Sequence, residues 1–261
     1  MTDAWRFIDT GPCSATHNMA LDEAIATVVR KDSAPPTLRL YGWDVPSVSI
    51  GYFQKTNDID IDYCIEKQIP IVRRPTGGRA ILHNLELTYS FSAKTLYGIF
   101  SKGLLDSYKK ISYALSLSLT KCGFSPGIMM NRKTPNYLSP LCFQSASYGE
   151  ITISNKKIIG SAQKRWTDGL LQQGSIPYII DKNEMTRIFR LKSTHVIREA
   201  SGLKEILPDL NPNELKNFIK ISFEEIFDTR LIVSAPSPEE VSLAQELEFQ
   251  KYLSNQWNFK R

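Results

Sequence analysis

IPIVRRPTGGRAILHNLELTYSFS, residues 69–92, is the stretch that decides the fold, because it places two adjacent glycines between apolar, strand-like runs. Glycine adopts backbone conformations that other residues avoid, and it lets a ligand approach the main chain closely. Three arginines surround Gly77 and Gly78, namely Arg73, Arg74 and Arg79. The stretch therefore predicts strand, glycine turn, strand. It leaves open whether the turn is a plain hairpin with solvated arginines or a ligand-binding loop. Its residue order matches neither a Walker A loop nor a dinucleotide-binding fingerprint.

Strands and helices are predicted on both sides of this stretch. Apolar alternation predicts strands at 5–9, 37–43, 47–53 and 169–180, and a hairpin over 150–162 that turns around Asn155 and Lys156. Helical spacing predicts helices at 14–31 and 57–68, and a long helix that ends near Gly123. Because strands outnumber crossover helices, we expect an α+β fold with a mixed, largely antiparallel sheet flanked by helices.

The sequence becomes mainly helical in its last third. Asn211 followed by Pro212, and Ser237 followed by Pro238 and Glu240, are typical helix starts. We therefore expect residues 1–261 to form a single domain, in which residues 181–261 are a mainly helical C-terminal portion packed on the core.

Composition excludes several classes of function. The net charge of +5 is too small and too evenly spread to indicate a nucleic-acid partner. The start of the chain lacks the basic and apolar regions of a signal peptide, and no apolar window approaches the roughly 20 residues of a membrane span. The cysteines and histidines are isolated from one another, so we expect no disulfide framework, no metal site and a cytoplasmic location.

Cys142 and Lys157 are a candidate pair for covalent catalysis. A thiolate is the reactive form of cysteine, and a nearby ammonium group lowers the thiol pKa by favouring that form. Lys157 follows Cys142 by fifteen residues, across a predicted strand, and Gly160–Ala162 is a small-residue segment whose backbone N–H groups could bind a carbonyl oxygen. The alternative is a buried, inert Cys142 and a surface Lys157, which the spacing alone favours. His83 is likewise either a structural hydrogen bonder or part of the site.

Several segments together resemble one family. NMALDEA, LRLYGW followed by SVSIGYFQ, RRPTGGRAILH followed by ELTYS, CF, KIIGSAQKR, LLQQGSI and WNFKR occur in the order typical of the biotin/lipoate A/B protein ligase superfamily. The sequence most resembles the octanoyltransferases of the LipM type in that superfamily. The resemblance extends from Trp5 to Arg261. Each of these segments alone is weak evidence for the family, but their combination is specific.

The resemblance implies an acyltransferase of lipoate biosynthesis. It implies transfer of an octanoyl group from acyl carrier protein to a lysine of a lipoyl-domain protein, such as the glycine cleavage H protein. The intermediate would be a thioester on Cys142, Lys157 would lower the pKa of that cysteine, and neither ATP nor another cofactor would be needed. The candidate substrate-binding residues, from the resemblance and from the glycine and small-residue segments, are Arg73, Arg74, Gly77, Gly78, His83, Gly160, Ser161 and Ala162.

Two positions depart from the family pattern. Relatives usually carry a proline near Ala146 and an aspartate at the position of Asn84. The first difference bears on the path of the chain after Cys142, and the second puts an acidic partner for His83 in question.

Three other functions stay open at this point. An ATP-dependent lipoate–protein ligase shares the fold and the lysine but needs no cysteine at position 142. An amidotransferase would move octanoyl between lipoyl proteins, again through a cysteine. A non-catalytic lipoyl-domain-binding protein would need neither Cys142 nor Lys157. The sequence contains no G-R-G-R-x-G-R-x-W segment, so a biotin ligase is not expected.

Overall fold

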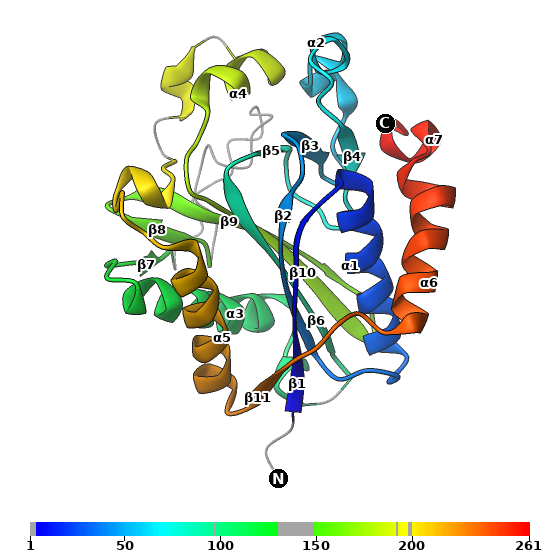
Figure 1. Cartoon of the computed structure of the whole chain (residues 1–261), viewed down its shortest axis with the longest axis vertical. Helices are drawn as coiled ribbons and strands as arrows, with labels where there is room; N and C mark the ends of the chain where they lie inside the picture. Colours follow the sequence, from blue (N-terminus) through cyan, green and yellow to red (C-terminus); the bar gives the residue numbers. More distant parts are fainter. Residues whose placement is uncertain (1–3, 97, 130–148, 192, 198–199) are drawn as a thin grey trace.

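The computed structural model describes residues 4–96, 98–129, 149–191, 193–197 and 200–261 of the chain. Most of its strands form one large twisted sheet with helices on both faces (Figure 1). The strands of this sheet are β1 (Ala4–Cys13), β2 (Thr37–Trp43), β6 (Glu86–Lys94), β7 (Gly127–Ile128), β8 (Ile151–Ile153), β9 (Lys156–Arg165), β10 (Gly169–Pro177) and β11 (Arg230–Val233).

The order in the large sheet is β11-β1-β2-β6-β10-β9-β8-β7. β1 pairs in parallel with both β11 and β2, and every pair from β2 to β7 is antiparallel. The expected mixed, largely antiparallel sheet is therefore confirmed.

A smaller sheet contains β3 (Ser47–Ile50), β4 (Ile71–Arg73) and β5 (Ile81–His83). β3 lies in the middle, parallel to β4 and antiparallel to β5. The plain-hairpin reading of the glycine stretch is therefore wrong, because β3 separates the two strands that the turn connects. Residues 74–80, called the glycine loop below, pass the end of β3, where Tyr52 N–H donates to Thr76 O at 2.9 Å.

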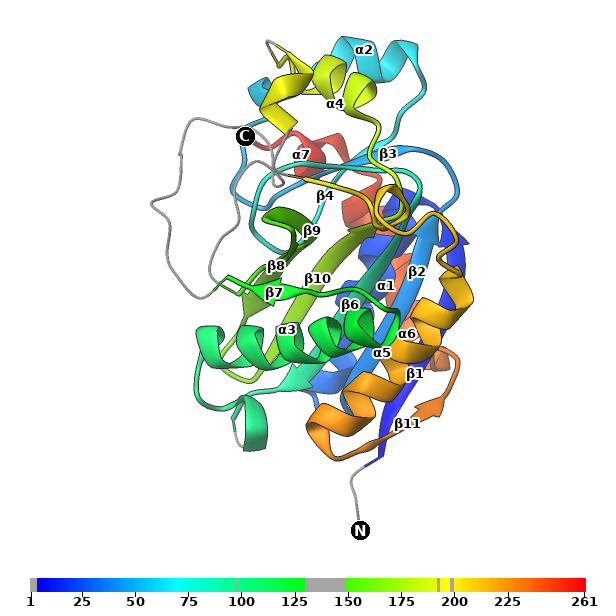
Figure 2. The ribbon, with the colours of Figure 1, turned by 90° about the vertical axis from the view of Figure 1, so that its left-hand side faces the viewer.

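Helices cover both faces of the large sheet. On one face lie α1 (Ala15–Arg30) and α6 (Pro238–Leu247), and on the other lie α3 (Leu104–Lys121) and α5 (Pro212–Phe227), while the short α7 (Asn255–Asn258) lies beside β4 of the smaller sheet (Figures 1 and 2). Two short helices, α2 (Ile61–Glu66) and α4 (Lys182–Ile188), pack with the smaller sheet. No helix in the described ranges has the length and apolar character that crossing a membrane requires.

The helix starts follow the local signals in the sequence. Ser14 accepts a hydrogen bond from the His17 backbone N–H at the start of α1. Ser237 and Glu240 form a capping box at the start of α6, which satisfies N–H groups that the helix itself cannot bond.

Two details differ from the sequence expectation. The hairpin between β8 and β9 turns at Ser154 and Asn155, one residue earlier than predicted, and both residues have positive φ, as a type I′ turn requires. The C-terminal portion, which is mainly helical as expected, also contributes one short strand that the sequence did not predict, β11 at the edge of the large sheet.

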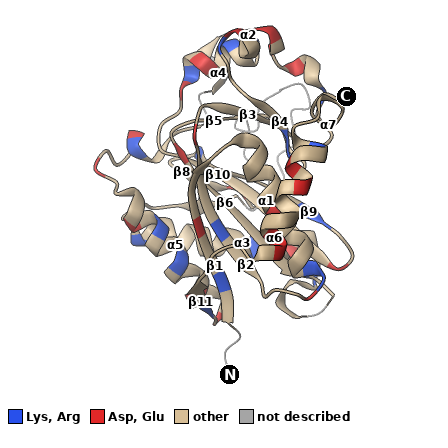
Figure 3. Ribbon diagram, turned by 45° about the vertical axis from the view of Figure 1, so that its right-hand side comes forward, with Lys and Arg blue, Asp and Glu red and all other residues tan. Residues whose placement is uncertain are grey.

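Three hydrophobic clusters hold these layers together. The largest lies between the large sheet and helices α3 and α5 and includes an aromatic group formed by Trp5, Phe91, Phe100, Phe223 and Phe227. A second lies between α1, the sheet and α6, and a third lies under α2 and α4. Charged residues of both signs lie on the outer helices, for example around α4 and α5, in keeping with the small net charge (Figure 3).

Candidate functional site

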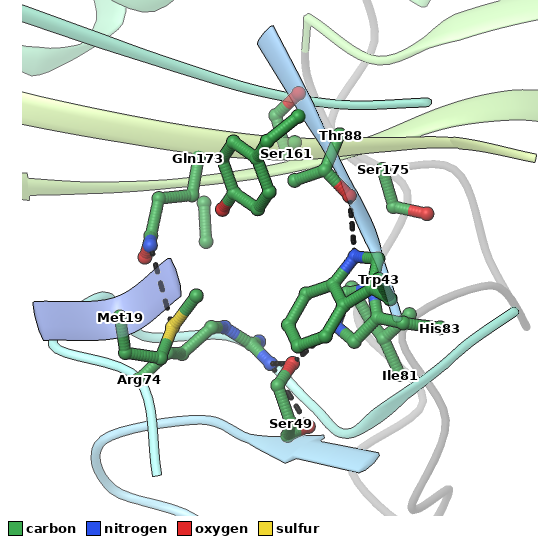
Figure 4. A pocket seen from close by; sticks show the side chains of 14 residues that line it. Met19, Trp43, Ser49, Arg74, Ile81, His83, Thr88, Ser161, Gln173 and Ser175 are labelled. Carbon is green, nitrogen blue, oxygen red and sulfur yellow. Dashed lines mark hydrogen bonds between the residues drawn. The ribbon is translucent and has the colours of Figure 1, made fainter. Parts of the chain in front are cut away.

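An open pocket lies between the α1 side of the large sheet and the smaller sheet. Met19 and Gln173 lie on one side of the space and Trp43 and His83 on the other (Figure 4). The lining residues are Met19, Tyr41, Trp43, Ser49, Arg74, Ile81, His83, Thr88, Gly160, Ser161, Ala162, Gln173, Gly174 and Ser175.

The glycine loop curls around the Arg74 side chain. The guanidinium donates to Gly77 O at 2.8 Å, to Arg79 O at 2.7 Å and to Ser49 O at 3.1 Å. Gly78 has φ +84°, and a Cβ there would lie 2.9 Å from Arg74 Nη2. Both the backbone angle and the close approach therefore favour glycine at position 78.

The end of β3 packs equally tightly against this loop. A Cβ on Gly51 would lie 1.9 Å from Gly78 O, a distance that no side chain can occupy without moving the backbone. Close packing of the glycine loop therefore also requires Gly51, which lies 27 residues before Gly78. The sequence around Gly51 does not indicate this role.

Arg73 holds the loop from behind and is not among the pocket-lining residues. Its side chain is fully buried, and Nη1 donates to Gly51 O at 2.7 Å and to Gln54 O at 2.8 Å. The Arg73 backbone N–H donates to Asn258 Oδ1 at 2.9 Å. Burial lowers the pKa of this guanidinium, and the charge of Arg261 lowers it further. The two adjacent arginines therefore differ in their relation to the pocket, because Arg74 lines it and Arg73 lies behind the glycine loop.

A buried polar chain connects the glycine loop to α1. Thr76 Oγ1 donates to Gln173 Oε1 at 2.8 Å, and Gln173 Nε2 donates to Asp22 Oδ2 at 2.8 Å. Asp22 also accepts from Arg39 Nη1 at 2.7 Å and from the Tyr41 hydroxyl at 2.8 Å. Burial and the charge of Asp22 raise the pKa of Tyr41 well above its usual value. The loop position therefore depends on a fully partnered buried network.

His83 lies on the pocket wall with an acidic partner. Its ring stacks on Trp43 at a centroid distance of 3.9 Å, and its Nδ1 lies 2.8 Å from Glu86 Oε1. Glu86 therefore supplies the acidic partner that the asparagine at position 84 had put in question. Glu86 also accepts from the hydroxyls of Thr88 and Ser175.

Hydrogen bonding defines a consistent proton arrangement for this ring. Arg74 Nη1 donates to Ser49 Oγ at 2.9 Å, and Ser49 Oγ lies 2.7 Å from His83 Nε2. All three contacts are satisfied when the Ser49 hydroxyl donates to Nε2 and the Nδ1–H group donates to Glu86. His83 is thus held on both ring nitrogens.

A bulge in β9 determines the direction of Lys157. In the register with β8, Thr152 lies opposite Lys157, and Ile151 lies opposite Ile159. Ile158 is therefore an extra residue in β9, and the side-chain alternation of this strand shifts at that point.

The shift places Lys157 on the pocket face of the sheet. In a regular strand Lys157 and Gly160 would point to opposite faces, because they are three residues apart. With the extra residue, Lys157 shares a face with Gly160 and Ala162, which lie opposite Ser175 and Gln173 of β10.

Lys157 is almost fully buried, with 1% of its surface exposed, and its Nζ lies 2.5 Å from Glu150 Oε1. Glu150 is itself buried. A buried ammonium group needs such a counter-charge. Cys142 lies outside the described residues, so its distance from Lys157 stays a prediction.

Five of the expected site residues line the pocket together, namely Arg74, His83, Gly160, Ser161 and Ala162. Gly78 borders it, with a Cβ position 3.5 Å from that of Ala162. The carbonyl of Gly77 binds Arg74, and Arg73 lies behind the loop. In the ranges that the structure describes, no group of three or more metal-ligating side chains converges.

Sequence reasoning missed Glu86, Glu150 and the polar residues of β10. Gln173 and Ser175 are polar residues at alternate positions of a strand that is buried along its length. Buried polar side chains need partners, so their occurrence in a predicted core strand is a signal for a polar network.

Known proteins share sequence and fold with this chain. The family model of the lipoyl protein ligase A/B catalytic domain matches residues 14–224. The octanoyltransferase LipM of Carboxydothermus hydrogenoformans is 36% identical over 268 residues, and that of Bacillus cereus is 35% identical over 281 residues. Both alignments cover 99% of this chain and 99% of the relative. A bipartite lipoate protein ligase from Thermoplasma acidophilum has a similar fold, with a TM-score of 0.80, 23% identity, and coverage of 98% of this chain and 96% of that one.

Proposed function

This chain belongs to the lipoyl protein ligase A/B catalytic domain family, and from that premise we propose that it is an octanoyltransferase of lipoate biosynthesis. Its full-length similarity to octanoyltransferases supports this activity. The donor is octanoyl-acyl carrier protein, and the acceptor is a lysine of a lipoyl-domain protein such as the glycine cleavage H protein. The structural observation that carries the proposal is a buried Lys157 on the same sheet face as Gly160 and Ala162 of the pocket wall.

The pocket is suited to an apolar acyl chain. Its walls include the side chains of Met19, Tyr41, Trp43 and Ile81. Arg74, a charged residue of the lining, directs its guanidinium at carbonyl and hydroxyl oxygens of the protein. Each buried CH₂ of an acyl chain contributes about 0.8 kcal/mol to binding.

The transfer proceeds in two balanced steps. The Cys142 thiolate attacks the octanoyl thioester, the enzyme-bound thioester forms, and the thiolate of the donor leaves and takes a proton from solvent. The acceptor amine then attacks this thioester, an amide forms, the amine gives up a proton, and the Cys142 thiolate is released. Both steps exchange acyl groups without a phosphoanhydride, so no ATP is needed.

Lys157 and Glu150 prepare this site electrostatically. The ammonium of Lys157 stabilises the thiolate form of Cys142, and Glu150 compensates the charge of Lys157 inside the protein. Gly78, whose backbone is exposed beside Ala162, offers an N–H group for the oxyanion. The unpaired thiols of Cys13, Cys64 and Cys122 fit a reducing cytoplasm.

Intact-protein mass spectrometry tests the proposal. The chain is mixed with octanoyl-acyl carrier protein without ATP, and Cys142→Ala serves as the matched control. We expect one octanoyl group on the wild-type chain, on the peptide that holds Cys142, and its loss when H protein is added.

The rival functions predict different masses. A lipoate ligase would give no adduct, but it would label a lipoyl domain once ATP and free lipoate are supplied. An amidotransferase would take its octanoyl group from an octanoylated lipoyl domain in preference to the carrier protein. Normal ATP-independent transfer by Cys142→Ala would contradict the thioester route.

A further inference from the structure

Five cationic side chains gather beside the glycine loop and form what we call the basic cluster. They come from β4, β9, the π-helical segment Glu248–Tyr252 after α6 and the residues after α7, and Figure 3 shows blue segments on β9 and near α7. The members are Arg73, Lys164, Lys251, Lys260 and Arg261.

Two aromatic rings hold the lysines of the basic cluster close together. Lys260 Nζ lies 3.8 Å from the ring centroid of Tyr52 and 3.6 Å from that of Trp257. Lys164 Nζ lies 5.6 Å from the same Tyr52 ring. Trp257 in turn donates its indole N–H to Arg73 O at 2.8 Å. Tyr52 and Trp257 therefore form a preformed wall between surface lysines and a buried arginine.

The basic cluster is short of negative charge. Glu23 pairs with Lys251 at 2.6 Å. In the described part of the chain, the other four cations have no carboxylate within ion-pair distance, and these are Arg73, Lys164, Lys260 and Arg261. The buried Arg73 Nη2 also has no hydrogen-bond partner among the described residues. Such an arrangement of like charges costs free energy unless an anion joins it.

The lowered pKa of Lys260 agrees with the excess of positive charge in the basic cluster. Burial lowers the pKa of Lys260 to about 8, and the charges of Arg73, Lys251, Arg261 and Lys164 add to the effect.

The basic cluster lies next to the pocket wall along β9. Lys164 follows Ala162 by two residues in β9 and lies on the same face as Ala162 and Gly160. Tyr52 follows Gly51, the glycine that packs against Gly78 O, and its N–H group donates to Thr76 O. A molecule that fills the pocket with its acyl end and leaves past Ala162 reaches Lys164 and Lys260 next.

We propose that Lys164 and Lys260 of the basic cluster bind a phosphate group of the acyl donor, and that the positive charge of the buried Arg73 also attracts this phosphate. This inference rests on the proposed function. The arm that holds an acyl thioester on a carrier protein is joined to that protein through a phosphodiester, which is a compact anion. Clustered ammonium groups bind phosphate oxygens through charge-assisted hydrogen bonds. Lys164 and Lys260 both lie against the Tyr52 ring, so the two ammonium groups can contact one small anion together.

A pair of minimal donors tests the site directly. Octanoyl-phosphopantetheine carries the phosphate, and octanoyl-pantetheine lacks it. We expect the wild-type chain to be acylated about tenfold more efficiently by the phosphorylated donor, which corresponds to about one charge-assisted hydrogen bond. In the double variant Lys164→Ala/Lys260→Ala the ratio of the two efficiencies should fall to about one. Lys102→Ala, which removes an exposed lysine outside the cluster, should leave the ratio unchanged.

A binding measurement separates this inference from the proposed function. Inorganic phosphate should raise the thermal unfolding midpoint of the wild-type chain and of Lys102→Ala, but not that of the double variant. If octanoyl-acyl carrier protein does not acylate the chain, the octanoyltransferase proposal fails, and the phosphate measurement still decides the site.

Two results would overturn the phosphate site. One is an equal efficiency of both donors with the wild-type chain. The other is protection by ATP but not by inorganic phosphate, together with ATP-dependent use of lipoate, because that would assign the basic cluster to a nucleotide.

Discussion

Thr76 and Gln173 lie 97 residues apart in the sequence, and the Thr76 hydroxyl donates to the Gln173 side-chain oxygen at 2.8 Å. Gln173 in turn donates a hydrogen bond from its side-chain Nε2 to Asp22 Oδ2. One contact therefore ties the glycine loop to the strand that forms the pocket floor and to the helix that packs behind it. The shape of the loop is set by tertiary contacts as well as by its glycines.

Replacing Thr76 by valine removes this contact while keeping the side-chain volume. Gln173 Oε1 is then left buried without its donor, so we expect the free energy of unfolding to fall by about 1–3 kcal/mol. Urea denaturation measures the change. Thr120→Val is the matched control, because Thr120 is exposed and bonds only within its own helix. An equal loss in both variants would contradict a role for the Thr76 contact.

Gly51→Ala should damage the site without a change in polarity. The new Cβ would lie 1.9 Å from Gly78 O, and backbone has to move to relieve the clash. We expect a loss of stability of about 1–3 kcal/mol and a larger loss of acyl transfer, as the glycine loop shifts. Gly42→Ala is the control, because its Cβ meets its nearest neighbour at an ordinary 3.6 Å. Denaturation and single-turnover acylation of both variants give the comparison, and equal behaviour would argue against a close-packed loop.

Glu86→Gln tests the acidic partner of His83. The carboxylate accepts from His83, Thr88 and Ser175, whereas an amide would direct its NH₂ group at one of these donors. We expect a loss of about 1–3 kcal/mol in the free energy of unfolding. Glu66→Gln affects an exposed pair with Lys67 and should change stability by less than about 0.5 kcal/mol. A silent Glu86→Gln variant would mean that the network is not needed for the fold.

Two of the cysteines should resist alkylation at neutral pH. Burial raises the pKa of both Cys64 and Cys122 to about 11. A raised pKa keeps each in the unreactive thiol form, so its thiolate fraction falls about tenfold for every pH unit below 11. Iodoacetamide labelling followed by peptide mass spectrometry should therefore show both cysteines unmodified at pH 7 and increasingly modified above pH 9. Rapid labelling of either at pH 7 would contradict the burial argument.

The same labelling experiment tests Lys157. If its ammonium stabilises the Cys142 thiolate, Cys142 is alkylated at lower pH than the other two cysteines. In Lys157→Ala the midpoint of that reaction should move to higher pH. Cys64 and Cys122 serve as internal references in the same sample. An unchanged profile of Cys142 would remove Lys157 from its proposed role.

Local signals in the sequence predicted the elements that depend on local interactions. Helix α1 follows from the spacing of its apolar residues and from the Ser14 cap, and α6 follows from the Ser237–Glu240 capping box. The mixed sheet followed from the number of strands relative to crossover helices.

The errors concern pairings between distant segments. The glycine pair indicated a turn correctly, but nothing near it shows that β3 inserts between β4 and β5. The four residues of β11 are too few for a periodic pattern, and its pairing partner β1 lies at the other end of the chain. A local pattern does not encode which strand lies beside which.

The candidate site likewise combines residues that the local sequence indicates with contacts that it does not indicate. Its glycines are visible in the sequence because close backbone approach needs that residue type, and its arginines and Lys157 are visible because they lie beside glycine and small-residue segments. The direction of Lys157 depends on a one-residue bulge, which the spacing between Lys157 and Gly160 does not reveal. Its counter-charge Glu150 was also missed, since an acidic residue before a strand is ordinary in isolation.

The contact between Arg73 and Asn258 has a consequence for the order of events during protein synthesis. These residues are separated by 185 positions, and Asn258 binds both the backbone N–H and, through its carbonyl, the side chain of Arg73. At about 5–20 residues per second, a ribosome needs on the order of ten seconds or more to pass from one to the other. During that interval the nascent chain has its pocket strands but lacks Asn258, the partner that Arg73 binds. The contact that fixes Arg73 can therefore form only after all the strands that line the pocket have been synthesised.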